Sequence, residues 1–229
     1  MGSEMCIRDR VKYLGQEISA AGVRPLPSKM QSIIDVPKPS TNVELQRYLG
    51  MVNFYHRFLP GIAASLSPLH ALVAAAKSPK TKLVWNESAV SAYERSKEKL
   101  FSPVLLAYPK PKAKLSLTTD ASDIAIGAVL AQEDGRPLGF FSRKLSAAQQ
   151  KYSAFDKELL GIKEAIKHFR HMVAGRQFVV YTDHKPLTLV MPTATSRTPR
   201  QERHLSYICL LYTSPSPRDL STSRMPSSA

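Results

Sequence analysis

The stretch that decides the fold is LSLTTDASDIAIGAVL, residues 115–130. Apolar and polar residues alternate along LSLTT, which is typical of a half-buried β-strand, and a second apolar run follows within a few residues. Asp120 lies where the first run ends. An aspartate between two strands is often a turn former, but a carboxylate at a strand end can also ligate a metal ion. A metal site needs several acids, so the rest of the chain decides between these interpretations.

The residues that follow extend this pattern into a sheet. After a strand expected at residues 124–132, an EDGRP turn leads to a strand at 138–144, and a long helix over 147–169 precedes a last strand at 177–182. Three strands joined by short turns, then a helix and a further strand, predict an α/β (α+β) fold with a mixed sheet. Because the helix is a crossover connection, we expect the last strand to be parallel to one of the earlier strands.

A second acid, Asp183, directly follows the last strand. If the first and last strands are parallel neighbours, Asp120 and Asp183 both lie at the carboxyl edge of the sheet, where open α/β sheets bind ligands. The alternative is that Asp183 only caps the turn that follows it.

The third candidate acid is Glu158, on the long helix. At about 100° per residue, Glu158 falls about 60° to one side of the apolar stripe, whereas Asp156 falls about 100° to the other side. Lys157 and Glu164 point away from the stripe, so we expect Glu158 alone among the acids of this helix to face the sheet. A solvated helix flank is the alternative for Glu158. Carboxylates held close together repel one another unless a cation neutralises them, and hard oxygen ligands of this kind indicate Mg²⁺.

The residues before this sheet predict a helical segment. Residues 11–26 read as a short strand, a turn at Gly22 and an extended exit that contains proline. Thr41 and Glu44 have the spacing of a capping box, and Asn86 is a capping residue. The expected helices cover residues 28–36, 42–59, 62–76 and 87–100. Three prolines at 103, 109 and 111 predict a linker over residues 102–113.

Composition limits the class of protein. Hydrophobic residues make up 43% of the chain and charged residues 22%, which is ordinary for a globular protein. No apolar run reaches the roughly 18 residues that a membrane span needs, so we expect no membrane partner. The formal net charge of +14 favours a polyanionic partner, because neutralising phosphates releases their counterions. Charge alone does not separate nucleic acid from an anionic membrane surface.

The two ends of the chain share an unusual property. One piece of DNA, read in opposite orientations, can encode both MGSEMCIRDR at residues 1–10 and CLLYTSPSPRD at residues 209–219. That DNA resembles a transposase-type sequencing adaptor. We therefore expect residues 1–10 and 209–229 to be artefactual, adaptor-derived ends. Both cysteines, Cys6 and Cys209, lie in these ends, which removes disulfide and cysteine–metal interpretations.

Longer motifs resemble a known family. TTDASDIAIGAVLAQ, FSRKLSAAQQKYSAFDKELLGI and VVYTDHKPL resemble the RNase H domain of gypsy-type LTR retrotransposon Pol polyproteins. Upstream, VKYLGQEISAAGVRP and ELQRYLGMVNFYHRFLPGIAASLSPLHAL are similar to the end of the palm and the thumb of the same reverse transcriptases. The resemblance implies a palm hairpin at 11–26, thumb and connection helices at 27–101, the linker at 102–113 and an incomplete, C-terminally truncated RNase H-like domain at 114–208.

The resemblance also implies an activity and a site. The family combines an RNA-directed DNA polymerase with a ribonuclease H that uses four acids and two Mg²⁺ ions, and three of these acids map onto Asp120, Glu158 and Asp183. Residues expected to lie near nucleic acid or the metal site are Asn53, Tyr55, His56, Arg57 and His184. The alternative is that the aromatic residues among them belong to the helical core, that the polar ones are a solvated face and that His184 is structural.

The same resemblance indicates what is missing. The polymerase aspartates would precede residue 11, and the fourth ribonuclease acid would follow residue 208, so we expect this fragment itself to be inactive. The partners implied for the parent are the RNA–DNA hybrid, the template–primer, the upstream polymerase fingers and palm, and a downstream integrase. The location implied is intracellular, in cytoplasmic virus-like particles.

The sequence also admits three other interpretations. A catalytically inactive, nucleic-acid-binding relic would keep the fold and the charge without the carboxylate set. An actin-like ATPase also begins with an aspartate-containing hairpin, but this sequence lacks a second phosphate-binding hairpin and a glycine-rich adenosine site. A purely structural helical connector accounts for residues 27–101 but not for the rest of the chain.

Overall fold

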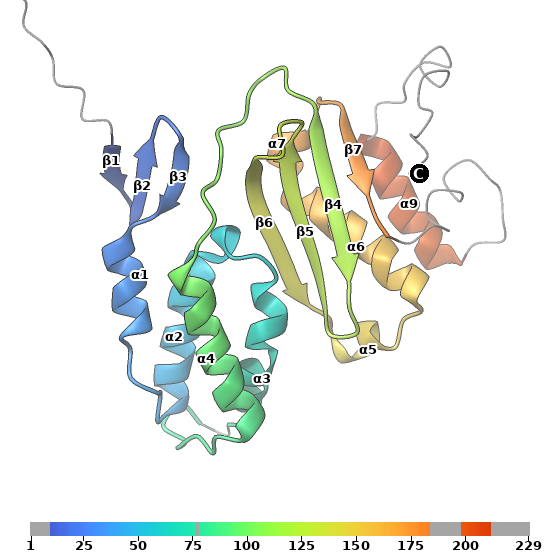
Figure 1. Ribbon diagram of the computed structural model, residues 1–229. Helices are drawn as coiled ribbons and strands as arrows, with labels where there is room; N and C mark the ends of the chain where they lie inside the picture. Colours follow the sequence, from blue (N-terminus) through green and yellow to red (C-terminus); the bar gives the residue numbers. More distant parts are fainter. Residues whose placement is uncertain (1–9, 77, 184–197, 212–229) are drawn as a thin grey trace, which may run out of the picture.

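The computed structural model describes residues 10–76, 78–183 and 198–211, which form two parts (Figure 1). The first part holds a three-stranded sheet and a group of helices, and the second holds a four-stranded mixed sheet with its own helices. This arrangement confirms the expected α/β (α+β) class. Within these ranges no helix combines the length and the apolar character that crossing a bilayer requires.

The chain begins with a small antiparallel sheet. Its strands are β1 (Arg10–Tyr13), β2 (Gln16–Ser19) and β3 (Gly22–Pro25). The sequence predicted only one strand before the turn at Gly22. The structure has two because Leu14 and Gly15 form a further turn with φ values of 45° and 77°. A positive φ is uncommon for leucine, so nothing in the sequence pattern indicated that turn.

The helices of the first part lie where the sequence placed them. They are α1 (Pro27–Ile34), α2 (Asn42–Phe54), the 3₁₀ helix η1 (His56–Phe58), α3 (Ile62–Ala75) and α4 (Glu87–Phe101). The capping box of Thr41 and Glu44 is present, and the Asn86 side chain accepts from the N–H of Ala89 over 2.9 Å. The expected helix over 42–59 is broken at Tyr55, where α2 ends and η1 begins.

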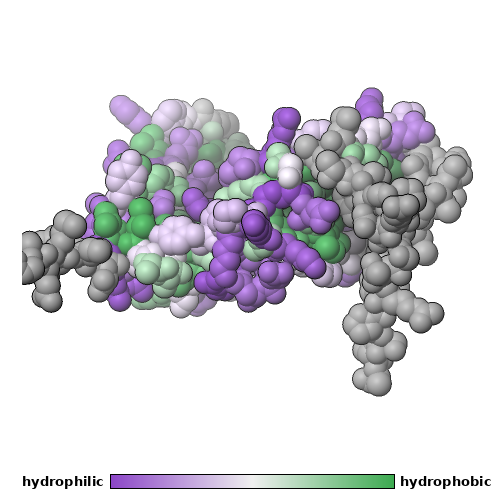
Figure 2. Space-filling view, turned by 90° about the horizontal axis from the view of Figure 1, so that it is seen from above, coloured by the Kyte–Doolittle hydropathy of each residue, from purple (hydrophilic) through white to green (hydrophobic). Residues whose placement is uncertain are grey.

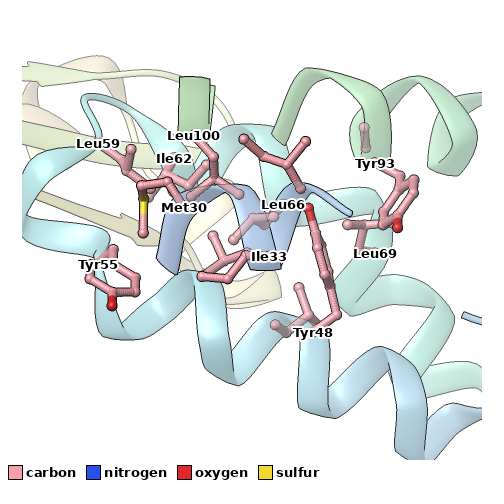
Figure 3. Packing of buried hydrophobic residues seen from close by; sticks show 14 of the residues in the cluster. Met30, Ile33, Tyr48, Tyr55, Leu59, Ile62, Leu66, Leu69, Tyr93 and Leu100 are labelled. Carbon is pink, nitrogen blue, oxygen red and sulfur yellow. The ribbon is translucent and has the colours of Figure 1, made fainter. Parts of the chain in front are cut away.

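One apolar core holds these helices together. Tyr48 and Tyr93 are fully buried at its centre, with their ring centroids 4.9 Å apart, and the Tyr48 hydroxyl lies 2.5 Å from the Ser96 hydroxyl. Figure 3 shows Met30, Ile33, Leu66 and other side chains of α1 to α4 directed toward the same interior. On the face seen from above in Figure 2, hydrophilic residues separate the hydrophobic ones into several patches.

The segment expected as a linker, residues 102–113, is bound to both parts. Leu106 is fully buried and exchanges backbone hydrogen bonds of 2.8 and 2.9 Å with Val23. The next residue, Ala107, lies in the core of the second part and donates to the carbonyl of Pro137 over 2.8 Å. The expected domain boundary therefore falls in a segment that is paired with residues on both sides of it.

The second sheet has the strand order β6-β5-β4-β7. Its strands are β4 (Leu115–Ala121), β5 (Ala125–Gln132), β6 (Pro137–Lys144) and β7 (Phe178–Tyr181). Neighbours along the chain are antiparallel, whereas β4 and β7 are parallel, as the helical crossover predicted.

The crossover is not one long helix. The chain forms α5 (Ala147–Gln150), α6 (Ala154–His168) and α7 (Arg170–Val173), and after the undescribed residues it continues as α9 (Pro199–Leu211). The prediction of a single helix over 147–169 was wrong because the Ser153 side chain accepts the N–H of Asp156 and starts a new helix. Leu205 and Ile208 of α9 are buried in the same core as α6.

Polar contacts and packing join the two parts. Helices η1 and α3 lie against β6. The Ser142 hydroxyl of β6 accepts the N–H of Ala63 over 3.0 Å, and His56 Nε2 lies 2.9 Å from the Ser142 carbonyl oxygen. A carbonyl only accepts, so His56 donates from Nε2.

Candidate metal centre

Two of the three predicted acids lie at the same edge of the second sheet. In the parallel pair of β4 and β7, Thr118 is opposite Tyr181. Asp120 and Asp183 each lie two residues further along the chain from this pair. Both aspartate side chains are exposed. The parallel register therefore brings the two carboxylates to neighbouring positions at the carboxyl edge.

The third acid, Glu158, approaches this edge from α6. Its side chain is buried, with 5% of the residue exposed, and its Oε1 accepts the backbone N–H of Ala121 over 3.0 Å. The other oxygen, Oε2, is also buried and has no hydrogen bond of ordinary geometry among the described residues. The Thr182 side chain also interacts with this carboxylate, but a buried carboxylate is costly, so the group is suited to a cation.

The three acids come together. Asp120, Glu158 and Asp183 each offer one oxygen, and these oxygens lie within 4.8 Å of one another. Burial raises the pKa of Glu158 to about 7, and the charges of Asp183 and Asp120 add to the rise, while hydrogen bonds from the Ala121 N–H and the Thr182 side chain oppose it. Three oxygen donors that repel one another, one of them on a buried carboxylate, fit a hard divalent cation.

Two neighbouring charges are placed differently from the prediction. Asp156 and Lys157 were expected to face water, but they are only 9% and 8% exposed. Helix α9 covers Asp156, which accepts from Gln201 Nε2 over 2.9 Å, and Lys157 Nζ donates to Asp123 over 2.6 Å. The helical period relates α6 only to the sheet, whereas α9 and the turn that carries Asp123 also cover these side chains.

Glu164 was also expected to point into water. Its side chain is 12% exposed and lies 3.2 Å from Arg143 Nη1 of β6 and 2.7 Å from Lys163 Nζ. Gln201 and Arg143, which pair with Asp156 and Glu164, come from elements distant in sequence. Only the run of three charges after a capping serine, Asp156 to Glu158, could have signalled buried pairing.

The predicted nucleic-acid contacts separate into two groups. Asn53 and Arg57 are exposed, whereas Tyr55 is 5% exposed and its hydroxyl donates to the carbonyl of Gly15 over 3.3 Å. His56 is half-buried against β6, through the contact with Ser142 described above. His184 lies outside the described residues. The placement of Tyr55 agrees with the alternative that the aromatic residues belong to the core.

A family model matches a segment that includes most of the second part of the chain. The model for the RNase H-like domain found in reverse transcriptase matches residues 85–180. This segment belongs to that family. The matched range includes α4 and the 102–113 segment as well as the mixed sheet. Asp120 and Glu158 lie inside this range, and Asp183 lies outside it.

Curated relatives of the chain are retrotransposon Pol polyproteins. The chain is 36% identical over 182 residues to the Pol polyprotein from transposon 297 of Drosophila melanogaster. The aligned segment covers 79% of the chain and 17% of the relative. It is 36% identical over 186 residues to the Tf2-3 polyprotein of Schizosaccharomyces pombe, covering 79% of the chain and 14% of the relative. The chain thus spans less than a fifth of the length of these relatives.

Solved reverse transcriptases share the fold. The foamy viral protease-reverse transcriptase dRH in complex with double-stranded DNA matches with a TM-score of 0.76 and 21% identity, over 87% of this chain and 36% of that one. The foamy viral enzyme in complex with an RNA/DNA hybrid matches with a TM-score of 0.75 and 22% identity, over 88% and 28%. At this identity the likeness establishes the fold alone.

Proposed function

We propose that Asp120, Glu158 and Asp183 form a divalent-cation centre that hydrolyses the RNA strand of RNA–DNA hybrids. The observation that carries this proposal is the convergence of three carboxylate oxygens within 4.8 Å from β4, α6 and the residue after Thr182. The relatives support it, because they are Pol polyproteins. We further propose that the parent polyprotein copies RNA into DNA.

The three acids have different roles in this proposal. Asp120, Glu158 and Asp183 would hold the Mg²⁺ ions, with Asp120 on β4 as the central ligand and Glu158 and Asp183 on either side of it. When bound, such ions lower the pKa of the attacking water and stabilise the charge on the leaving 3′ oxygen. The hydrogen bond from Ala121 to Glu158 Oε1 fixes the carboxylate so that Oε2 is left for a ligand.

Substrate choice follows from the chemistry of the two strands. Only RNA has a 2′-hydroxyl group, and contacts to this group are the usual means by which proteins distinguish RNA from DNA. The net charge of +14 supports binding of a nucleic-acid backbone. We propose that Asn53 and Arg57, which are exposed, contact the template–primer of the parent polyprotein. In the same proposal the parent polyprotein also carries polymerase and integrase segments and works in cytoplasmic virus-like particles.

The test is a cleavage assay with a labelled RNA–DNA hybrid, carried out on a longer Pol polypeptide that contains this chain. We expect Mg²⁺-dependent cleavage of the RNA strand, and we expect Asp120→Asn to abolish cleavage while hybrid binding is retained. Asp134→Asn is the matched control, because Asp134 lies in the turn between β5 and β6, at the opposite edge of the sheet. Unchanged turnover in Asp120→Asn would overturn the assignment.

A further inference from the structure

Three consecutive charged residues near the start of α6 are buried. Asp156, Lys157 and Glu158 are 9%, 8% and 5% exposed. A buried charge is costly unless it is paired. Successive residues of a helix point about 100° apart, so these three cannot share a single partner element.

Three neighbouring elements supply the partners. Asp156 accepts a hydrogen bond from α9, and Glu158 accepts the backbone N–H of Ala121, the last residue of β4. Lys157 Nζ donates to Asp123 Oδ1 over 2.6 Å. Asp123 lies in the turn between β4 and β5, so Lys157 ties α6 to the residues that directly follow the end of β4.

The turn that carries Asp123 is internally bonded. The N–H of Ser122 donates to the carbonyl of Ala125 over 2.8 Å, and the Ser122 hydroxyl accepts the N–H of Ala125 over 3.1 Å. The Lys157 side chain is 10% exposed, whereas that of Asp123 is 94% exposed. The exposed carboxylate of Asp123 therefore pairs with the ammonium group of Lys157, which packs against the protein. Because the turn is internally bonded, an ion pair at Asp123 restrains the whole turn.

We propose that Lys157 is a positioning residue of the metal centre, whose ion pair with Asp123 holds the end of β4 against α6 and keeps the Asp120 and Glu158 carboxylates at ligand distance. This inference rests on the proposed function of the centre. The oxygens of the three acids lie within 4.8 Å of one another, and like charges at that distance repel. The repulsion pushes β4 away from α6, and an ion pair three residues beyond Asp120 opposes that movement.

The two halves of the ion pair make charge and position separable. Lys157→Met removes a positive charge, so a purely electrostatic role predicts tighter cation binding, whereas Asp123→Asn removes a negative charge and predicts weaker binding. A positioning role predicts that both substitutions weaken binding, by about tenfold, as changes beside metal ligands typically do. The Asp123 side chain is 94% exposed, so Lys157→Met leaves the Asp123 carboxylate in water rather than as an unpaired buried charge, and the variant is expected to fold.

The first measurement is the affinity of the full chain for Mn²⁺, by titration calorimetry. Lys167→Met is the matched control, because Lys167 is an exposed lysine of the same helix. Wild type and Lys167→Met are expected to bind alike, and both Lys157→Met and Asp123→Asn are expected to bind about tenfold more weakly. The reversed pair, Lys157→Glu with Asp123→Lys, is expected to recover most of the lost affinity.

The second measurement needs no metal. In EDTA, the amide of Ala121 reports directly on the contact between β4 and α6, and its hydrogen exchange should accelerate about tenfold in Lys157→Met and Asp123→Asn. The amide of Leu130, inside β5, should exchange as in the wild type, which excludes global unfolding.

The outcomes distinguish the two proposals. If the wild type binds no Mn²⁺, the proposed metal centre fails, and the role of Lys157 is overturned with it. If the wild type binds but Lys157→Met binds as tightly or more tightly, or the exchange of the Ala121 amide is unchanged, the positioning role is overturned while the metal centre stands.

Discussion

Glu158 is the residue at which burial and charge act together. Burial, followed by the charges of Asp183 and Asp120, raises its pKa from 4.5 to about 7. Between these two values the folded chain retains a proton that the unfolded chain has lost. The metal-free fold therefore loses stability as the pH rises from about 4.5 to 7, and above that range the loss stays constant.

Substituting Glu158 by Gln removes this dependence. Relative to Glu158→Gln, the wild type in EDTA should become less stable by about 2 kcal/mol between pH 5 and pH 8, since one pKa unit corresponds to about 1.4 kcal/mol. The measurement is urea unfolding of both proteins at the two pH values. A difference that does not change with pH would contradict the raised pKa. Saturating Mg²⁺ should reverse the loss in the wild type only.

At the residue scale the sequence could predict the acid trio but not its surroundings. Asp120 and Asp183 were placed correctly because a strand end and a parallel register follow from hydrophobic patterns. The inward position of Glu158 followed from the helical wheel. The burial of Asp156 and Lys157 did not, because it depends on α9 and on the β4–β5 turn, which no local pattern brings to α6.

At the scale of elements, the close approach of two segments depends on Gly22. A Cβ added to Gly22 would lie 2.2 Å from the backbone oxygen of Leu106, which is shorter than any allowed contact. Gly22→Ala should therefore separate β3 from the 104–107 segment and reduce the free energy of unfolding by at least about 3 kcal/mol.

Gly135→Ala is the matched control, because Gly135 also has a positive φ, 76°, but no atom lies within 4 Å of the added Cβ. It should cost about 1 kcal/mol, the strain of the left-handed backbone alone. Denaturant unfolding of the two variants and the wild type measures both effects. Equal losses in the two variants would show that the approach of Leu106 to Gly22 is not restrictive.

Ser153 starts the helix that carries Glu158. Its hydroxyl accepts the N–H of Asp156 over 3.1 Å and donates to the Asp156 carboxylate over 3.0 Å. Ser153→Ala should reduce the free energy of unfolding by about 1 kcal/mol, as the loss of a helix cap typically does. Ser91→Ala, at an exposed position within α4, should change it by less than about 0.5 kcal/mol. Thermal unfolding that ranks the two variants in the opposite order would contradict this role.

The elements were predictable where capping residues and apolar periods agree. Thr41, Glu44 and Asn86 located the starts of α2 and α4. The pattern failed at Leu14, where the backbone adopts a conformation that leucine rarely takes, and at Ser153, where a cap interrupts a continuous helical period. The packing of 102–113 was missed because three prolines resemble a linker whether or not the segment is bound.

At the scale of the whole molecule, His56, which joins the two parts, makes the stability of the fold depend on pH. Burial lowers its pKa below 6.5, and the hydrogen bond to the Ser142 carbonyl only partly opposes this. The pKa values of His70 and His168 are lowered as well, chiefly by burial. The unfolded chain therefore binds more protons in acid, and the folded state loses stability as the pH falls through about 6.5.

His56→Gln separates this contribution from the others, because a glutamine amide can still donate to the Ser142 carbonyl but does not titrate near neutral pH. The wild type should lose more stability than His56→Gln when the pH is lowered from 7.5 to 5.5, as measured by urea unfolding in the presence of Mg²⁺. Identical losses in the two proteins would contradict the role of His56 at the junction.

The central claim is that Asp120, Glu158 and Asp183 together hold a divalent cation. The most direct measurement is the anomalous diffraction of Mn²⁺ in crystals of the chain grown at neutral pH. A peak within ligand distance of all three carboxylates, absent from crystals of Asp120→Asn, is the predicted result. If crystals saturated with Mn²⁺ show an anomalous peak elsewhere on the chain but none at this position, the account is contradicted.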